Sequence, residues 1–164
     1  PIIAKSHEGN LDSLRANRAG PQSPGAVKKP DVFYVTASVE LGNTTTKCIV
    51  MATNLNTSEC YLLNKTVKMT RDIRPPKPNE EVFGKTVWGI ELSKEAVADL
   101  IKDTVLESLK KAHVDKDNDL DFVVRSTGVT AGFATAEEAG QLVIALAGYP
   151  TKKNVSGYEC FPTS

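Results

Sequence analysis

Residues 32–53 decide the fold expected for this chain and read VFYVTASVELGNTTTKCIVMAT. The segments 32–39 and 47–53 are rich in β-branched and aromatic residues, which favour β-strands. Between them, residues 42–46 are small or carry side chains that form hydrogen bonds, which is typical of a turn. The stretch therefore predicts two antiparallel strands joined by a tight turn.

A third strand is expected over residues 59–69, after a turn at residues 54–57. Four of its side chains are expected to share one face by strict alternation, namely Tyr61, Leu63, Lys65 and Val67. Together with the first two strands, this segment predicts an antiparallel meander of three strands.

A helical pattern follows a proline-rich loop at residues 74–78, where helix and central strand are both excluded. An extended piece is expected over residues 83–92, centred on 87–90. Ser93 can then cap a helix over residues 93–113, whose apolar stripe consists of Val97, Ile101, Val105 and Leu109. A polar turn at 115–121, a strand at 121–125 and a second helix at 135–148 complete the pattern. The chain is therefore expected to be an α/β protein with three antiparallel strands followed by helix, strand and helix.

The 164 residues are enough for one ordinary domain. Residues 1–31 are expected to be a flexible extension or linker that docks loosely or mediates contacts, because prolines and glycines cluster at 20–30. One short helix could form within it at residues 10–18. Residues 32–148 form the expected domain, and residues 149–164 an irregular, truncated tail.

Composition excludes several classes of protein. Lys plus Arg and Asp plus Glu both number 20, so the net charge is zero and a nucleic-acid partner is not expected. No apolar stretch reaches the roughly 18–20 residues of a membrane span. The three cysteines, Cys48, Cys60 and Cys160, fit neither a disulfide framework nor a metal knuckle, so a cytoplasmic location is expected.

The strongest candidate site is the turn that follows the first strand, from Glu40 to Lys47. Backbone amides and hydroxyls in such a turn can hold phosphate oxygens, and the expected contacts are Gly42, Asn43, Thr44, Thr45 and Thr46. Glu40 could hold Mg²⁺ through water, and Lys47 could neutralise phosphate charge. The alternative is a threonine-rich hairpin turn that binds nothing.

A second candidate is the loop Ser126-Thr127-Gly128, which leaves the carboxyl end of a strand. Ligands usually bind at that position in α/β sheets, and this loop could face the same phosphates. The alternative is a connecting turn in which Gly128 supplies a left-handed conformation.

Two further groups of residues and one tryptophan could have a function. The alternating acids Asp115 to Asp121 resemble a calcium loop, but the glycine and glutamate that such a loop needs are absent, so a solvated turn is expected. Arg71, Arg74 and Lys77 could bind an anion or a partner, with a solvated loop as the alternative. Trp88 is expected to anchor a core or an interface.

Three segments carry a resemblance to a known family: 37–47, 64–76 and 124–133. They resemble the methanogenesis marker protein 14 family, archaeal proteins of unknown function found in methanogens, over about residues 32–148. The turn itself resembles the first phosphate loop of the actin/Hsp70/sugar-kinase ATPase superfamily. Glu40 stands where that superfamily usually has Asp, so its carboxylate extends one methylene further.

The resemblance implies a ribonuclease-H-like, actin-like ATPase subdomain, which is one half of a duplicated fold. It implies ATP and Mg²⁺ as cofactors, and the N-terminal half of an ATP-binding protein that activates, reactivates or assembles a methanogenesis enzyme. The second phosphate loop and the adenosine pocket of such proteins are not found in this chain. No catalytic residue is therefore assigned, and hydrolysis by this chain alone is not expected.

The alternative function is a non-catalytic interaction or scaffold module that retains the ATPase fold. Half of a duplicated fold would leave an apolar face exposed. A protein partner or a homodimer would then cover that face.

Overall fold

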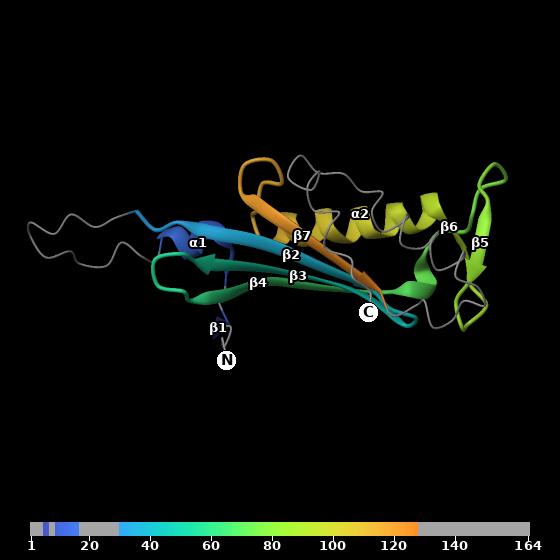
Figure 1. Ribbon diagram of the computed structural model, residues 1–164, viewed down its shortest axis with the longest axis horizontal. Coiled ribbons are helices and arrows are strands. Elements are labelled where there is room, and N and C mark those ends of the chain that lie inside the picture. The colour runs from blue at the N-terminus through green and yellow to red at the C-terminus, as the bar shows by residue number, and fades with distance from the viewer. Residues whose placement is uncertain (1–4, 7–8, 17–29, 128–164) are drawn as a thin grey trace, which may run out of the picture.

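The computed structural model describes residues 5–6, 9–16 and 30–127 (Figure 1). The expected second helix at 135–148, Gly128, Cys160 and the tail at 149–164 lie outside the described residues, as does most of the linker at 20–30. No helix in the described part of the chain is long and apolar enough to cross a membrane.

A five-stranded sheet, in the order β1-β4-β3-β2-β7, forms the centre of the described structure. Strands β2 (Phe33–Leu41), β3 (Thr45–Asn54) and β4 (Cys60–Met69) are antiparallel, which confirms the predicted meander. Strand β7 (Leu120–Thr127) pairs parallel to β2, and β1 (Lys5–Ser6) pairs parallel to β4. The fold is therefore mixed α/β, and the carboxyl ends of β2 and β7 meet at one end of the sheet.

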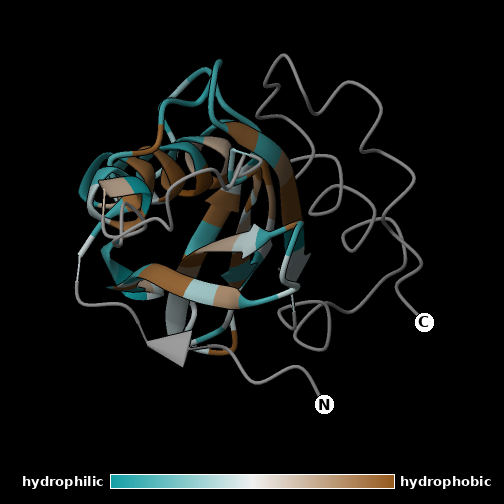
Figure 2. Ribbon diagram, turned by 90° about the vertical axis from the view of Figure 1, so that its left-hand side faces the viewer, coloured by the Kyte–Doolittle hydropathy of each residue, from teal (hydrophilic) through white to brown (hydrophobic). Residues whose placement is uncertain are grey.

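Helix α2 (Lys94–Lys111) covers one face of this sheet, which we call the inner face. The predicted stripe is confirmed, because all four of its side chains are buried: Val97, Ile101, Val105 and Leu109. Ser93 caps the helix as expected, accepting a hydrogen bond from the Ala96 amide at 3.1 Å. The apolar side chains on the inner face of β2 and β3 are those of Val35, Ala37, Val39, Leu41, Cys48, Val50 and Ala52. Hydrophobic residues recur along both layers in Figure 2.

Strand β4 departs from strict alternation because its register with β3 shifts at Leu63. An extra residue in one strand reverses which side chains face inward. Leu63 is buried, whereas Lys65 and Val67 beyond it are exposed. The predicted common face of Tyr61, Leu63, Lys65 and Val67 is therefore wrong.

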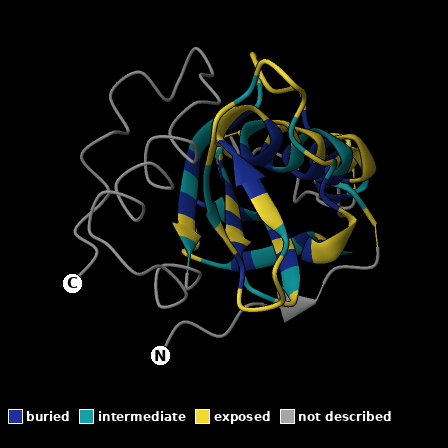
Figure 3. Ribbon diagram, turned by 90° about the vertical axis from the view of Figure 1, so that its right-hand side faces the viewer, coloured by how far each residue is buried: buried dark blue, intermediate teal, exposed yellow. Residues whose placement is uncertain are grey.

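A two-stranded hairpin stands beside the N-terminal end of α2 (Figures 1 and 3). It consists of β5 (Val82–Lys85) and β6 (Glu91–Ser93), with residues 86–90 as its tip. The Thr86 amide donates to the Ile90 carbonyl at 2.9 Å, and Gly89 takes a positive φ of 78°. The predicted extended piece over 83–92 is confirmed at its ends, 83–85 and 91–92, and is wrong at its centre, because residues 87–90 form the turn between two short strands.

Helix α1 (Leu11–Ala16) belongs to the hydrophobic core. Leu11 and Leu14 are buried, and the Leu11 amide donates to the carbonyl of Ala112, just beyond α2, at 2.9 Å. Asn10 and Ser13 cap the helix reciprocally through their side chains. Loose docking was predicted for this segment, because six helical residues are too few for a periodic signal to reveal burial.

The acids of residues 115–121 make turn contacts. Asp115 accepts hydrogen bonds from the amides of Asp117 and Asn118, and these bonds lower its pKa. Asp121 accepts from the Val35 amide at 2.9 Å, where the β2–β7 register shifts. The predicted solvated turn is confirmed, and within the described residues no group of three His, Cys, Asp or Glu side chains is suited to hold a metal ion.

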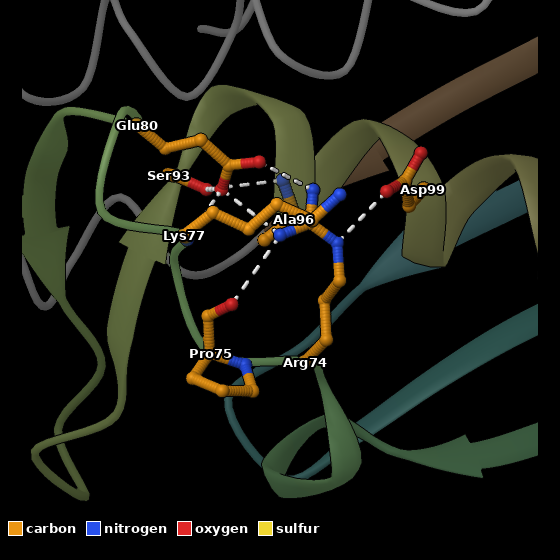
Figure 4. Close-up of polar contacts among 7 residues, drawn as sticks. All are labelled: Arg74, Pro75, Lys77, Glu80, Ser93, Ala96 and Asp99. Atoms are coloured by element: carbon orange, nitrogen blue, oxygen red, sulfur yellow. Dashed lines mark hydrogen bonds and ion pairs between the residues drawn. The ribbon is translucent and has the colours of Figure 1, made fainter.

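The proline-rich loop is held by Arg74 (Figure 4). Its guanidinium contacts both carboxylate oxygens of Glu80, at 2.8 and 2.9 Å, and Asp99 on α2 at 2.8 Å. Glu80 also accepts hydrogen bonds from the Ser93 hydroxyl and the Lys77 amide. These contacts tie the loop, the root of the hairpin and the N-terminal part of α2 together.

This network corrects the suggestion that Arg74 binds an external anion. Its two carboxylate partners occupy the guanidinium within the chain and raise its pKa. In turn, Arg74 and then Ser93 lower the pKa of Glu80 to about 2, from its ordinary value of 4.5.

We expect Leu11→Ala to destabilise the fold by about 2–5 kcal/mol, because it leaves a cavity at a fully buried position. Thermal or denaturant unfolding measures this loss. Leu55→Ala is the matched control, since Leu55 is exposed and its change should alter stability by less than about 0.5 kcal/mol. Equal effects of the two changes would contradict the placement of α1 in the core.

We also expect the network around Glu80 to make stability depend on acid pH. Because the folded-state pKa of Glu80 is depressed, its ionised form stabilises the fold above about pH 4.5, and this stabilisation is lost as the pH falls toward 2. Glu80→Gln should lower the unfolding temperature at neutral pH. The difference in unfolding temperature between the variant and the native protein should become smaller as the pH falls toward about 3.

Glu81→Gln is the control for this experiment, because Glu81 is exposed and forms no ion pair within the described residues. If the difference in unfolding temperature between the native protein and Glu80→Gln stays constant across the acid range, ionised Glu80 does not stabilise the fold in this way.

Candidate functional site

The candidate site lies at the end of the sheet where β2 and β7 both finish. Leu41 and Thr127 are register partners there, and the Thr127 hydroxyl donates to the Leu41 carbonyl at 2.8 Å. The two loops that the sequence singled out, 42–47 and 126–128, therefore begin side by side. Gly128 itself lies outside the described residues.

Gly42 is required by a close backbone approach. Its amide donates to the Thr45 carbonyl at 3.0 Å, which closes the turn between β2 and β3. A Cβ at this position would lie 2.6 Å from that carbonyl oxygen, closer than real contacts allow. Any side chain at residue 42 would therefore force the turn open.

Thr70, directly after β4, holds this turn in place through hydrogen bonds. Its hydroxyl donates to the Gly42 carbonyl at 2.7 Å, and its amide donates to the Thr44 carbonyl at 2.9 Å. The hydroxyl also lies 3.0 Å from that of Thr46, and both residues are fully buried. Thr46 was expected to contact phosphate, but its hydroxyl is turned inward, so its role here is to position the turn.

The tip of the turn keeps its donors uncommitted. Within the described residues, no backbone carbonyl accepts a hydrogen bond from the amides of Asn43 and Thr44. The Asn43 Oδ1 atom is buried without a hydrogen-bond partner, while the Thr44 side chain is exposed and that of Thr45 half-buried. Adjacent free amides and hydroxyls form the kind of concave donor array that binds anions.

Three other predicted residues form a row across the outer face of the sheet, the face opposite α2. Glu40 on β2 is the register partner of Lys47 on β3 and of Ser126 on β7, and all three are exposed. Side chains directly opposite each other in neighbouring antiparallel strands have Cβ atoms roughly 5 Å apart. The structure thus gathers Glu40, Lys47 and Ser126 beside the turn.

The candidate residues therefore divide between the two faces. Glu40, Lys47 and Ser126 lie on the outer face, Asn43 and Thr44 at the tip, and Thr46 on the inner face. Thr70 is the residue that the analysis of the site missed. Its only signal was its presence in the segment 64–76 that carries the resemblance, because nothing local marks a threonine after a strand as the anchor of a distant turn.

The cysteines offer no reactive centre among the described residues. Cys48 and Cys60 are both free and buried. Burial raises the pKa of the Cys48 thiol to about 11, so it stays protonated at neutral pH and is a poor nucleophile or metal ligand.

Comparison with known proteins identifies relatives of this chain. The family described as uncharacterized proteins conserved in archaea (DUF2114) matches residues 33–162. An uncharacterized protein of Methanothermobacter thermautotrophicus is 64% identical over 149 residues, covering 90% of this chain and 28% of that protein. An uncharacterized protein of Methanocaldococcus jannaschii is 63% identical over 119 residues, covering 73% of this chain and 24% of that protein.

Among solved structures, the PPX-GPPA enzyme of Aquifex aeolicus matches with a TM-score of 0.39 and 10% sequence identity, over 70% of this chain and 32% of that one. The chain spans about a quarter of the length of the two curated relatives it matches. It belongs to the archaeal family of uncharacterized proteins described as DUF2114.

Proposed function

We propose that residues 40–47 form one phosphate-binding loop of an ATP-binding protein, in an actin-like ATPase subdomain. The single observation that carries this proposal is the place of the turn tip at the carboxyl ends of β2 and β7, which is the usual ligand position in α/β sheets. The amides of Asn43 and Thr44 at this tip have no backbone acceptor within the described residues. Free amides occur at the two central residues of any tight turn, so it is the place of this turn, where two parallel strands end, that favours a ligand.

The residues present fit an anion at this place. Gly42 allows the backbone to approach closely, and the exposed Thr44 hydroxyl adds a donor beside the two amides. Lys47 supplies one positive charge on the outer face next to the tip. These groups would bind and orient phosphate oxygens and offset their charge, which is the main requirement of phosphoryl-transfer sites.

Glu40 fits Mg²⁺ only through water. A lone carboxylate facing Lys47 across the strand pair is not a set of direct ligands, and Mg²⁺ usually keeps several of its waters. When bound, the ion would neutralise phosphate charge. The buried Asn43 Oδ1 could accept a hydrogen bond from a water of its shell.

The expected client of the whole protein is a methanogenesis enzyme that it activates, reactivates or assembles. That part of the proposal rests on the resemblance of residues 37–47, 64–76 and 124–133 to the methanogenesis marker protein 14 family. Because the relatives are about four times as long as the matched segment, the remaining nucleotide contacts would come from the rest of the polypeptide.

Calorimetric titration of Mg-ATP into the full-length protein tests the loop. We expect Lys47→Ala to weaken binding by about tenfold or more, because a hydrogen bond to a charged group contributes roughly 1.5–3 kcal/mol. Lys65→Ala is the matched control, since Lys65 is also exposed on the sheet but lies two register pairs further from the turn. No binding by the native protein, or equal loss in both variants, would refute the role of Lys47.

Gly42→Val tests the backbone of the turn separately. The new side chain would meet the Thr45 carbonyl, so we expect Mg-ATP binding to be abolished while the unfolding temperature falls only modestly. Gly89→Ala is the control in a different turn, where a Cβ would meet nothing within 4 Å although the positive φ adds some strain. Unchanged nucleotide binding by a folded Gly42→Val protein would rule the loop out.

A further inference from the structure

The middle of the outer face of the sheet is apolar. Register pairing across β4, β3, β2 and β7 places one row of four side chains on this face: Leu62, Met51, Thr36 and Phe122. The next row toward the turn at 42–46 consists of Lys65, Ile49, Ser38 and Val124. The apolar side chains of both rows are half-buried, so each keeps part of its surface in contact with solvent.

Strands β3 and β7 have the composition of strands that are covered on both faces. Residues 48–52 of β3 and 122–124 of β7 are unbroken apolar runs. A strand covered on one face alternates between apolar and polar residues, whereas a strand buried on both faces is apolar throughout. The inner members of these runs, such as Val50 and Val123, are buried in the core. Their neighbours Met51 and Phe122 point the other way and indicate that a second layer belongs on the outer face.

The described residues supply no such layer. Helix α2 packs against β2, β3 and β4 from the inner face. Within the described part of the chain, the apolar side chains of the outer rows belong neither to the hydrophobic core nor to the partly buried residues packed against it. Tyr34 and Val67, which are 40% and 49% exposed, extend the same face as register partners of Thr53 and Lys47. The outer face is therefore a broad apolar surface, of the kind that marks a site of interaction.

The length of the relatives indicates what covers this face. The chain spans about a quarter of each, so about three quarters of the full-length polypeptide lies outside it. Strands β4, β2 and β7 run parallel, and α2 connects β4 to β7 over the inner face. Connections between parallel strands are right-handed, so a connection from β7 to a further parallel strand beyond it crosses the same inner face. The outer face is therefore left to a helix from another part of the full-length protein.

We infer that the outer face is an internal docking surface of the full-length protein, on which an amphipathic helix from outside these 164 residues packs its apolar stripe. Ile49, Met51 and Phe122 are the central contacts of that stripe, since they lie in the two adjacent apolar rows. The charged row of Glu40 and Lys47 borders the face, so the helix is polar where it reaches them. The inference does not depend on nucleotide binding, because the two apolar rows contain none of the proposed phosphate contacts.

Hydroxyl-radical footprinting, read by mass spectrometry, tests this without nucleotide. The full-length protein and the 164-residue chain are oxidised under the same conditions, at a concentration where sedimentation velocity shows the shorter chain to be monomeric. We expect Met51 and Phe122 to be oxidised in the 164-residue chain and to lose this reactivity in the full-length protein. Leu120 is the control on the same strand as Phe122, because it is fully buried on the inner face and should be protected in both proteins.

Met51→Asp tests the surface itself. The docked helix would bury this charge without a partner, so we expect the change to restore the oxidation of Phe122 in the full-length protein. Leu55→Asp is the matched control, since Leu55 is 57% exposed in the turn between β3 and β4, and Phe122 should stay protected in it. Protection of Leu120 in both variants shows that the sheet is still folded.

Four results would overturn the inference. Phe122 could be equally reactive in both proteins, which would mean that the face stays open. It could be equally protected in both, which would assign the cover to the 164-residue chain itself. Its protection in the full-length protein could disappear when that protein is diluted to a monomer, which would assign the face to a second copy. It could also survive Met51→Asp in a variant whose Leu120 is protected, which would place the covering helix elsewhere.

Discussion

Burial of α2 against a single face of the sheet determines where the candidate side chains on β2 and β3 point. Side chains alternate along a strand, so the burial of Leu41 against the core turns Glu40 outward, and the burial of Thr46 turns Lys47 outward. One packing interaction thus separates the residues that hold the turn from those that can meet a ligand. A shift of one residue in the β2–β3 register would exchange the two sets.

The parts of the fold that depend on local pattern were predictable. The β2–β3 hairpin follows from two β-branched runs around a glycine, and α2 follows from an apolar side chain at every fourth position after a capping serine. The shift at Leu63 was not predictable, because an extra residue in one strand is visible only against its partner. An extended segment was predicted at residues 87–90 for a similar reason. A short run of apolar side chains at the tip of a hairpin has the same local pattern as a strand.

The candidate site was predictable in composition but not in arrangement. Sequence reasoning found Glu40, Gly42 and Lys47, because each is adjacent to the turn in the chain. It missed the anchoring role of Thr70 and the engagement of Arg74 by Glu80 and Asp99, since these contacts join residues distant along the chain or depend on how the proline-rich loop folds back. Local propensity carries no information about such contacts. A polar residue that binds a ligand and one that only holds the fold together therefore cannot be told apart in the sequence.

The register shift in β4 helps to protect the edge of the sheet against aggregation. Strand β1 covers β4 only at Tyr61 and Leu62, so within the described residues the rest of β4 runs along the rim of the sheet. Exposed rim strands invite strand-by-strand addition of other chains, and proteins resist this with irregular backbone and lysines. Strand β4 has both, in the irregularity at Leu63 and in Lys65 and Lys68. Its backbone is therefore a poor template for amyloid-like growth.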